Sequence, residues 1–218
     1  MRRESWISLT RNSLVRIEVK KSVFIAEAGP IRSAEDAQQR IDGIRKQYPD
    51  ATHHVYAWRI GREEVLQKYS DDGEPSGTAG MPVLDALRKN DIDDSIIVVT
   101  RYFGGTQLGT GGLVRAYGSA AAGAVQAAQP CVFVKAREYE ITVDFSLYER
   151  LKYVLDKEGY SVGRIRYEDL PVLSVSCPES ETEHLTRICR DVTSGRSEPL
   201  HVGSTDMITE RVGDLPID

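Results

Sequence analysis

The stretch from Tyr69 to Tyr117 constrains the fold most, because it sets one strongly apolar run between two glycine-rich segments. The run from Ser95 to Thr100 is almost unbroken in β-branched residues, which predicts a strand buried on both faces. Glycine suits backbone at positive φ and places where another group approaches the backbone closely. The two glycine-rich segments therefore predict loops of special geometry at the ends of this strand.

The second glycine-rich segment runs directly into a helix-like segment, so its free N–H groups and the helix dipole could hold an anion. Arg101 and Arg115 suit phosphate recognition, because one guanidinium pairs two oxygens at once. The alternative is that both arginines form ion pairs with the acidic residues of the first segment. The predicted phosphate- or ligand-binding set is Arg101, Gly104, Gly105, Gly109, Thr110, Gly111, Gly112 and Arg115.

The acidic residues of the first glycine-rich segment are Asp71, Asp72 and Glu74. Their carboxylates could hold a hard cation such as Mg²⁺, which prefers oxygen ligands. However, Asp-Asp-Gly is also a common turn sequence, and the turn is the interpretation that we favour. No cofactor is predicted, with Mg²⁺ on these carboxylates as the alternative.

Four further residues are candidates for accessory roles at the site. His53, beside His54, could act as an acid or base. No Ser or Cys nucleophile pattern accompanies it, so we predict no catalytic residue. Tyr102, with the adjoining Phe103, could stack a nucleobase, although aromatic residues after a buried strand usually belong to the core. The accessory set is His53, Ser76, Thr78 and Tyr102.

Composition indicates an ordinary cytoplasmic protein. The chain has 218 residues, 40% of them hydrophobic and 28% charged, and no apolar run is long enough to predict a membrane helix. No apolar segment follows the first charged residues, so no signal peptide is expected. The three cysteines are widely spaced, without a Cys-x-x-Cys pair, which predicts reduced, structural thiols and no zinc site.

Charge is distributed unevenly along the chain. Residues 1–137 hold 19 Lys and Arg against 16 Asp and Glu, whereas residues 138–218 hold 9 against 17. A polyanion would therefore meet the first half and be repelled by the second. The alternative is that the acidic charge only keeps the second half soluble.

Hydrophobic periodicity predicts two domains of mixed α+β structure, residues 1–136 and 137–218. In the first, strands are expected near 14–20 and 22–25, a helix from 33 to 48, a hairpin from 54 to 69, and helices after Pro82 and from Gly112 to Ala128. That last helix carries a belt of Ala, Gly and Ser, which would let it lie close to the sheet. The second domain follows the order β-α-β-β-α-β of a ferredoxin-like fold.

Several long motifs carry a family resemblance. Asp71-Asp-Gly-Glu-Pro-Ser-Gly-Thr-Ala-Gly80, Thr100-Arg-Tyr-Phe-Gly-Gly105 and Leu108-Gly-Thr-Gly-Gly-Leu-Val-Arg-Ala-Tyr117 resemble the hallmark blocks of the IMPACT/YigZ family, and Ser22-Val-Phe-Ile-Ala26 and Ala51-Thr-His53 resemble its earlier blocks. The chain departs from the family pattern at His54, Val55 and Gln107. The resemblance implies an α/β first domain similar to the second domain of a small-subunit ribosomal protein, and a ferredoxin-like second domain similar to one in elongation factors.

The resemblance also implies a function, since eukaryotic members are linked to control of translation initiation through competition for a protein partner. We therefore expect a binding protein that acts in regulation of translation by contacting RNA, the ribosome or a protein partner, and that does not act at a membrane. An enzyme acting on a phosphorylated small molecule is the alternative, because Leu108-Gly-Thr-Gly-Gly-Leu resembles a phosphate loop of related metabolite kinases. No convincing catalytic base supports that alternative. A protein–protein adaptor that uses the acidic half is a third hypothesis.

Overall fold

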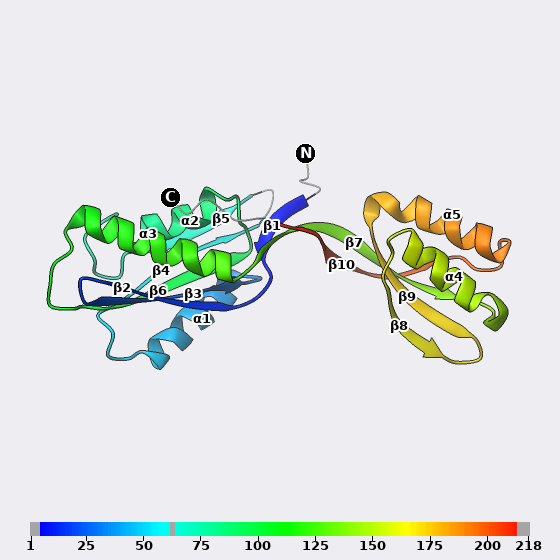
Figure 1. Ribbon diagram of the computed structural model, residues 1–218, viewed down its shortest axis with the longest axis horizontal. Coiled ribbons are helices and arrows are strands. Elements are labelled where there is room, and N and C mark those ends of the chain that lie inside the picture. The colour runs from blue at the N-terminus through cyan, green and yellow to red at the C-terminus, as the bar shows by residue number, and fades with distance from the viewer. Residues whose placement is uncertain (1–4, 62–63, 213–218) are drawn as a thin grey trace. The chain divides into compact units, whose positions relative to one another are not determined.

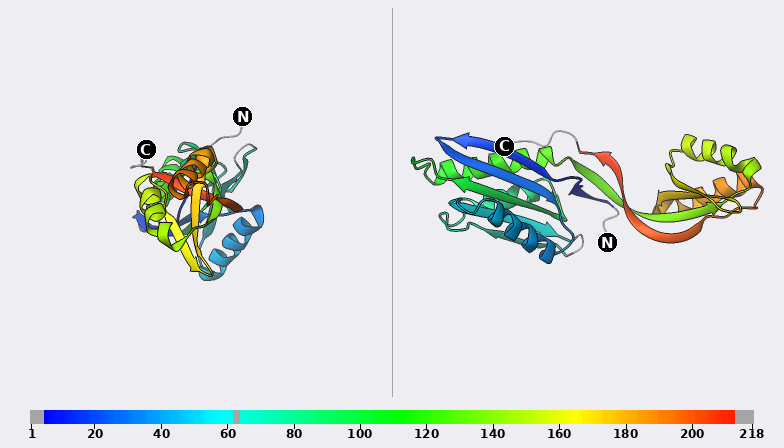
Figure 2. Two further views of the ribbon diagram at one scale, coloured as in Figure 1. Left: turned by 90° about the vertical axis from the view of Figure 1, so that its right-hand side faces the viewer. Right: turned by 90° about the horizontal axis from the view of Figure 1, so that it is seen from below.

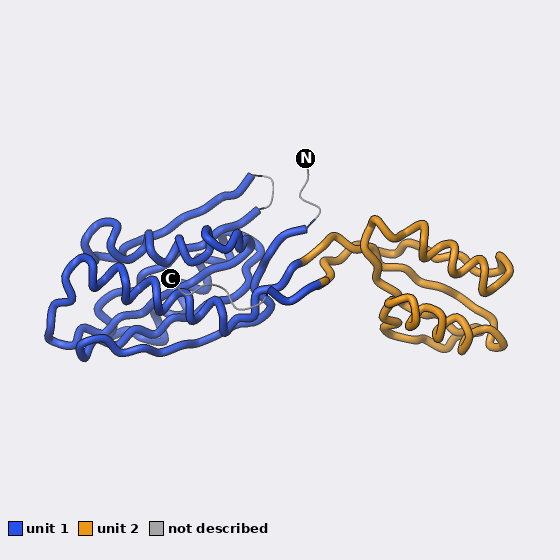
Figure 3. The backbone as a smooth tube through the Cα atoms, turned by 45° about the horizontal axis from the view of Figure 1, so that its top comes forward, with its two compact units in different colours: residues 1–132, 210–218 blue, residues 133–209 orange. Residues whose placement is uncertain are grey.

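The computed structural model describes residues 5–61 and 64–212, and its chain divides into two compact units (Figure 3). Unit 1 comprises residues 1–132 and 210–218, and unit 2 comprises residues 133–209. Strands β7 (Pro130–Thr142) and β10 (Leu200–Arg211) pair with each other and run through both units, side by side in green and red in Figures 1 and 2. The division therefore falls within two continuous strands.

Unit 1 is built on a five-stranded antiparallel sheet of order β2-β3-β6-β4-β5. Its strands are β2 (Ser13–Val19), β3 (Ser22–Pro30), β4 (His53–Ile60), β5 (Leu66–Ser70) and β6 (Ser95–Tyr102). The predicted apolar strand lies at the centre as β6, with β3 and β4 on its two sides. This position explains why every residue of β6 except Tyr102 is buried.

Three helices cover the two faces of this sheet. α2 (Gly80–Arg88) and α3 (Thr110–Ala127) pack on one face, against Ile97 and Val99, and α1 (Ala34–Gln47) packs on the other, against Ile96 and Val98 (Figure 1). Successive side chains of a strand point to opposite faces, so one apolar run supplies both cores. The prediction of a strand buried on both faces is confirmed.

The small side chains of α3 bring its backbone close to the sheet. Ala116, Ala120, Ala121 and Ala124 are all buried, and a Cβ added at Gly123 would lie only 3.5 Å from Val15 Cγ1. Larger side chains on this face would push the helix outward, because protein interiors are close-packed. The predicted close approach is confirmed.

Two strand segments were not predicted. β1 (Ser5–Leu9) pairs with β7, and β7 begins at Pro130, directly after α3. The sequence of β1, Ser-Trp-Ile-Ser-Leu, does not alternate apolar and polar residues, so no pattern marks it as a strand. Trp6, Ser8 and Leu9 are all buried. Such a short segment becomes a strand through its pairing partner rather than through its own pattern.

Unit 2 has the predicted β-α-β-β-α-β order. Its elements are β7, α4 (Phe145–Lys157), β8 (Val162–Tyr167), β9 (Pro171–Pro178), the short 3₁₀ turn η1 (Glu179–Glu181), α5 (Thr182–Thr193) and β10. The sheet order β10-β7-β9-β8 is that of a ferredoxin-like fold, which confirms the predicted fold class. Leu151, Leu155, Leu185 and Cys189 of the two helices belong to one buried core together with Leu173 of β9.

Among the described residues, no helix combines the length and the apolar character that a membrane crossing needs.

Candidate functional site

The first glycine-rich segment is a tight loop organised by Asp71. Its carboxylate accepts hydrogen bonds from the backbone N–H groups of Gly77 (2.9 Å), Ala79 (3.1 Å) and Gly80 (2.8 Å). Ala79 and Gly80 lie at the start of α2, where N–H groups have no partner within the helix, and Gly77 lies in the loop before it. Asp71 therefore caps α2 from a distance and is fully engaged in the loop.

Asp72 fastens the same loop to the neighbouring elements. Its Oδ2 accepts from the backbone N–H of His54 (2.6 Å), and its Oδ1 accepts from Arg45 Nη2 of α1 (2.9 Å). The loop turns back at this point, with φ of 44° at Asp72 and 89° at Gly73. Asp72 therefore points to β4 and α1, away from the partners of Asp71.

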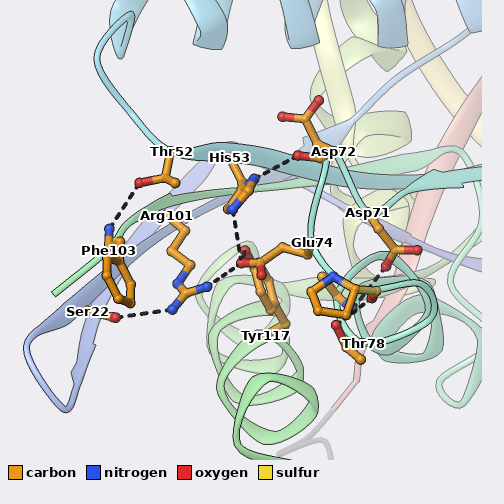
Figure 4. A network of polar contacts seen from close by, with 12 residues as sticks. Ser22, Thr52, His53, Asp71, Asp72, Glu74, Thr78, Arg101, Phe103 and Tyr117 are labelled. Atoms are coloured by element: carbon orange, nitrogen blue, oxygen red, sulfur yellow. Dashed lines mark hydrogen bonds and ion pairs between the residues drawn. The ribbon is translucent and has the colours of Figure 1, made fainter. Parts of the chain in front are cut away.

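Glu74 is the centre of a buried polar network (Figure 4). Its Oε1 accepts from Arg101 Nη1 (2.5 Å) and from the Tyr117 hydroxyl (2.7 Å). The side chains of Glu74 and Arg101 are only 4% and 6% exposed, and Tyr117 is fully buried. Burial, followed by the hydrogen bond to Glu74, raises the pKa of the Tyr117 phenol strongly, so this hydroxyl stays protonated and donates to the carboxylate.

His53 approaches the same carboxylate from β4. Its Nδ1 lies 2.8 Å from the carbonyl oxygen of Asp72, and its Nε2 lies 3.8 Å from Glu74 Oε1. A carbonyl oxygen only accepts, so Nδ1 must be the protonated nitrogen in the neutral ring. His53 therefore joins the first glycine-rich loop to the network.

Arg101 connects the network to the second glycine-rich segment. Its Nη2 donates to Ser22 Oγ (3.3 Å), and its guanidinium carbon lies 5.5 Å from the centre of the Phe24 ring and 5.6 Å from that of Phe103. Its Nε finds no hydrogen-bond partner among the described residues. Because Glu74 already neutralises this charge, a phosphate would reach Arg101 only by displacing Glu74.

The start of the second segment is held against the β2–β3 turn. Gly104 donates its N–H to Ser22 Oγ (3.1 Å), and a Cβ added at Gly104 would collide with the backbone of Lys21 and Ser22. Phe103 donates its N–H to Thr52 Oγ1 (3.1 Å), and the Tyr102 hydroxyl donates to Asp50 (3.0 Å). Gly104 is thus required by a close approach of two backbones.

The end of the second segment forms an open helix start. Gly109, with φ of 72°, caps α3 without a side-chain hydrogen bond, and the first turn contains no acidic residue. A hollow of about 310 Å³ lies beside this start, lined by Lys20, Leu108, Gly112 and Arg115 together with Ile17, Val19, Ala116 and Ser119. This lining contains two cations and no acid, which suits an anionic group.

The structure separates the predicted site residues into two groups. Arg101, Glu74 and His53 belong to the internal network, whereas Gly105, Gly109, Thr110, Gly111 and Arg115 lie exposed around the start of α3. Asp71, Asp72 and Glu74 face different partners, and the described residues contain no cluster of three side chains suited to a metal. Thr78 is buried and donates to the Pro75 carbonyl oxygen (2.6 Å), whereas Ser76 is exposed. Phosphate binding by the predicted residues and Mg²⁺ binding both stay predictions.

Sequence reasoning did not identify three residues of these groups: Ser22, Lys20 and Tyr117. A buried tyrosine hydroxyl needs a partner, so a tyrosine at an inward position of α3 was a usable signal. Ser22 begins one of the motifs that carry the family resemblance, whereas no comparable signal marks Lys20.

These features define an α+β protein in which an antiparallel sheet unit, with glycine-rich loops joined by a buried ion pair, precedes a ferredoxin-like unit. Residues 20–125 match the family described as the Impact N-terminal domain, and residues 141–196 match a domain of unknown function, DUF1949. The IMPACT family member YigZ of Escherichia coli is 31% identical over 91% of this chain and 98% of that protein. The chain therefore belongs to the IMPACT family, as its motifs predict.

Two further comparisons agree with membership of the IMPACT family. A Thermus thermophilus protein described as an IMPACT family member in the pol 5′ region is 42% identical over 82% of this chain and 97% of its own length. A crystal structure described as that of a hypothetical protein is 29% identical and superimposes with a TM-score of 0.58, covering 92% of this chain and 98% of that one. Both likenesses span the two units.

Proposed function

We propose that the protein acts in regulation of translation by binding RNA, free or within the ribosome, through a basic loop face. This face is defined as Lys20, Lys21, Phe103, Thr110 and Arg115. The observation that carries the proposal is the hollow where Lys20 and Arg115 flank the start of α3, which has no side-chain cap, with no acidic side chain in the lining. The link to translation rests on the family, through the resemblance to eukaryotic members.

The electrostatics of this face favour a phosphate. Lys20, Lys21 and Arg115 are exposed, and within residues 5–61 and 64–212 none of them forms an ion pair. The N–H groups at the start of α3 add partial positive charge at the same place. Neutralising phosphates with such cations releases counterions, which supplies affinity that falls steeply with salt.

Binding is a better explanation than catalysis for the neighbouring network. The carboxylate of Glu74, the guanidinium of Arg101 and the hydroxyl of Tyr117 are buried, and the carboxylate accepts hydrogen bonds from both of the others. Groups that act on a substrate must reach it within hydrogen-bond distance. We infer that the network fixes the loops that shape the basic loop face.

One observation also fits the alternative of an enzyme that acts on a phosphorylated small molecule. The hollow of about 310 Å³ has the size of a small-molecule site, and the start of α3 would bind a phosphorylated metabolite by the same contacts. Saturable competition by a phosphorylated small molecule, together with its turnover, would favour this alternative over RNA.

The test is fluorescence anisotropy of a short labelled single-stranded RNA over a series of salt concentrations. The variant Lys20→Gln/Arg115→Gln removes two cations from the face and leaves the buried network intact. Arg32→Gln/Lys46→Gln is the matched control, because it removes the same charge from exposed positions around α1. On a single strand, losing two phosphate contacts should flatten the log–log salt slope by about 1.4, whereas the control should keep the slope.

Two results would count against the proposal. Either the intact protein fails to bind RNA at low salt, or both double variants lose affinity equally, which would make the effect one of net charge alone. Co-sedimentation with ribosomal subunits then tests the link to translation, since the face variant should leave the ribosomal fractions and the control variant should remain in them.

A further inference from the structure

We infer that the basic loop face takes single-stranded RNA by stacking one unpaired base on Phe103, with the adjoining phosphates held by Lys20, Lys21 and Arg115. This inference rests on the proposed function and names the form of RNA that the face accepts. Phe103 was considered as a stacking residue from the sequence, where a core position was the more common alternative. The structure places it at the surface.

Phe103 is an exposed aromatic residue that the fold holds in place. Its side chain is 49% exposed, although most apolar residues of β6 beside it are completely buried. The backbone is fixed on both sides, because Phe103 donates to Thr52 and Gly104 donates to Ser22. The guanidinium of Arg101 lies over the ring, 5.6 Å from its centre (Figure 4).

A held ring of this kind suits base stacking. Every nucleobase has a flat face that can stack on an aromatic side chain, and such contacts contribute strongly to single-strand binding. Fixing the backbone that carries the ring before binding reduces the entropy that association would otherwise cost.

The two lysines beside Phe103 occupy a strained turn. Lys20 and Lys21 are the whole connection between β2 and β3, and their φ angles are 47° and 67°. Two-residue hairpin turns with positive φ at both positions strongly favour Asn-Gly or Gly-Gly. Strained backbone of this kind clusters at functional sites, and here it places two cations at the tip of the hairpin.

The cations and the ring are linked through neighbouring backbone. The backbone of Gly104, next to Phe103, packs against the backbone of Lys21, and Lys20 lines the same hollow as Arg115. A strand of RNA that stacks a base on Phe103 would therefore meet the lysine turn and then the start of α3. Asp50 also lies at this end, where it accepts the hydrogen bond of the Tyr102 hydroxyl.

This arrangement requires a single strand. In a duplex the bases are paired and stacked on one another, so their flat faces are not accessible to a protein side chain. Duplex RNA would keep only the phosphate contacts. We therefore expect the face to prefer single-stranded RNA, with little dependence on sequence.

The test compares Phe103→Leu with Tyr69→Leu in the intact protein. Tyr69 is the matched control, since it is 40% exposed on β5, at the opposite edge of the sheet from β2. The probe is a short RNA that contains 2-aminopurine, whose fluorescence is quenched by stacking. Phe103→Leu should weaken binding by about 5- to 150-fold, abolish the quenching by the protein and leave the salt slope unchanged, because no charge is lost.

The outcomes separate this inference from the proposed function. If intact protein binds RNA with a steep salt slope but Phe103→Leu binds equally well, or if duplex RNA binds as tightly as the single strand, the stacking inference is overturned and RNA binding stands. If the intact protein binds no RNA, both fail. Phe103→Trp guards against a folding defect, because a larger ring should retain both the affinity and the quenching.

Discussion

Replacing Glu74 by Gln should destabilise unit 1 substantially, since it removes the negative charge from a buried ion pair while keeping the shape of the side chain. The Arg101 guanidinium would then be a buried charge with no counter-ion, because the pair is 4% and 6% exposed. Breaking such a pair costs about 3–5 kcal/mol. Gln keeps an oxygen that can accept from Tyr117, so we expect about 3 kcal/mol, at the lower end of that range.

Urea unfolding followed by tryptophan fluorescence measures this loss directly. The two tryptophans of the chain, Trp6 and Trp58, are both buried in unit 1, so their emission reports the unfolding of that unit. With a urea slope of about 2 kcal/mol/M, a loss of about 3 kcal/mol lowers the midpoint by about 1.5 M.

Arg45→Gln is the matched control, since it breaks the ion pair with Asp72 at a side chain that is 42% exposed. An exposed pair of this kind contributes about 0–1 kcal/mol, so the midpoint should move little. The double variant Glu74→Gln/Arg101→Met should recover part of the loss, because it also removes the unpaired charge. A Glu74→Gln midpoint as close to wild type as that of Arg45→Gln would refute the reasoning.

Four other perturbations have defined outcomes. Tyr117→Phe should lower the unfolding free energy of unit 1 by about 1.5–3 kcal/mol in the same urea assay, because the carboxylate of Glu74 loses a buried donor; a coincident unfolding curve would contradict this. Lys21→Gly should stabilise unit 1 by about 0.5–1 kcal/mol, because the backbone strain of a lysine at positive φ costs more free energy than the added chain entropy of a glycine. The same variant should weaken RNA binding in the anisotropy assay, because it removes a cation. Burial raises the pKa of Glu27, so the folded protein loses stability as Glu27 ionises with rising pH. The Glu27→Gln variant should therefore have a higher urea midpoint than wild type near neutral pH. This difference should disappear below the usual pKa of glutamate, where Glu27 is protonated in both the folded and the unfolded protein. Burial also raises the pKa of Cys189 to about 12, so mass spectrometry should find this thiol alkylated by iodoacetamide only after unfolding.

The secondary structure was predictable wherever the side-chain pattern was strong. The continuous apolar run of β6 could be satisfied only by burial on both faces, and the small residues of α3 only by close packing on a sheet. The start of α1 was also predictable, because serine is a favoured N-cap residue. In the structure Ser33 accepts a hydrogen bond from the backbone N–H of Asp36 at 3.2 Å. β1 and the first residues of β7 were missed because their extended form depends on pairing across the chain.

The glycine-rich loops were recognisable from the sequence, but the direction of their polar side chains was not. Asp71, Asp72 and Glu74 are nearly adjacent in the chain, yet the loop turns one toward α2, one toward β4 and α1, and one into the core. The backbone has positive φ at both Asp72 and Gly73, where the loop turns back between these neighbouring carboxylates. Sequence proximity alone could suggest a metal cluster that the fold does not assemble.

By itself, the sequence determined the fold class, the family and the presence of two glycine-rich loops, because periodicity, turn residues and long motifs are local properties of the chain. Only the tertiary structure decided which charges are exposed. It buries Arg101 against Glu74, which lies 27 positions away, and leaves Arg115 at the surface beside Lys20. Ion pairing and burial depend on contacts between distant segments, and those contacts exist only once the sheet has formed.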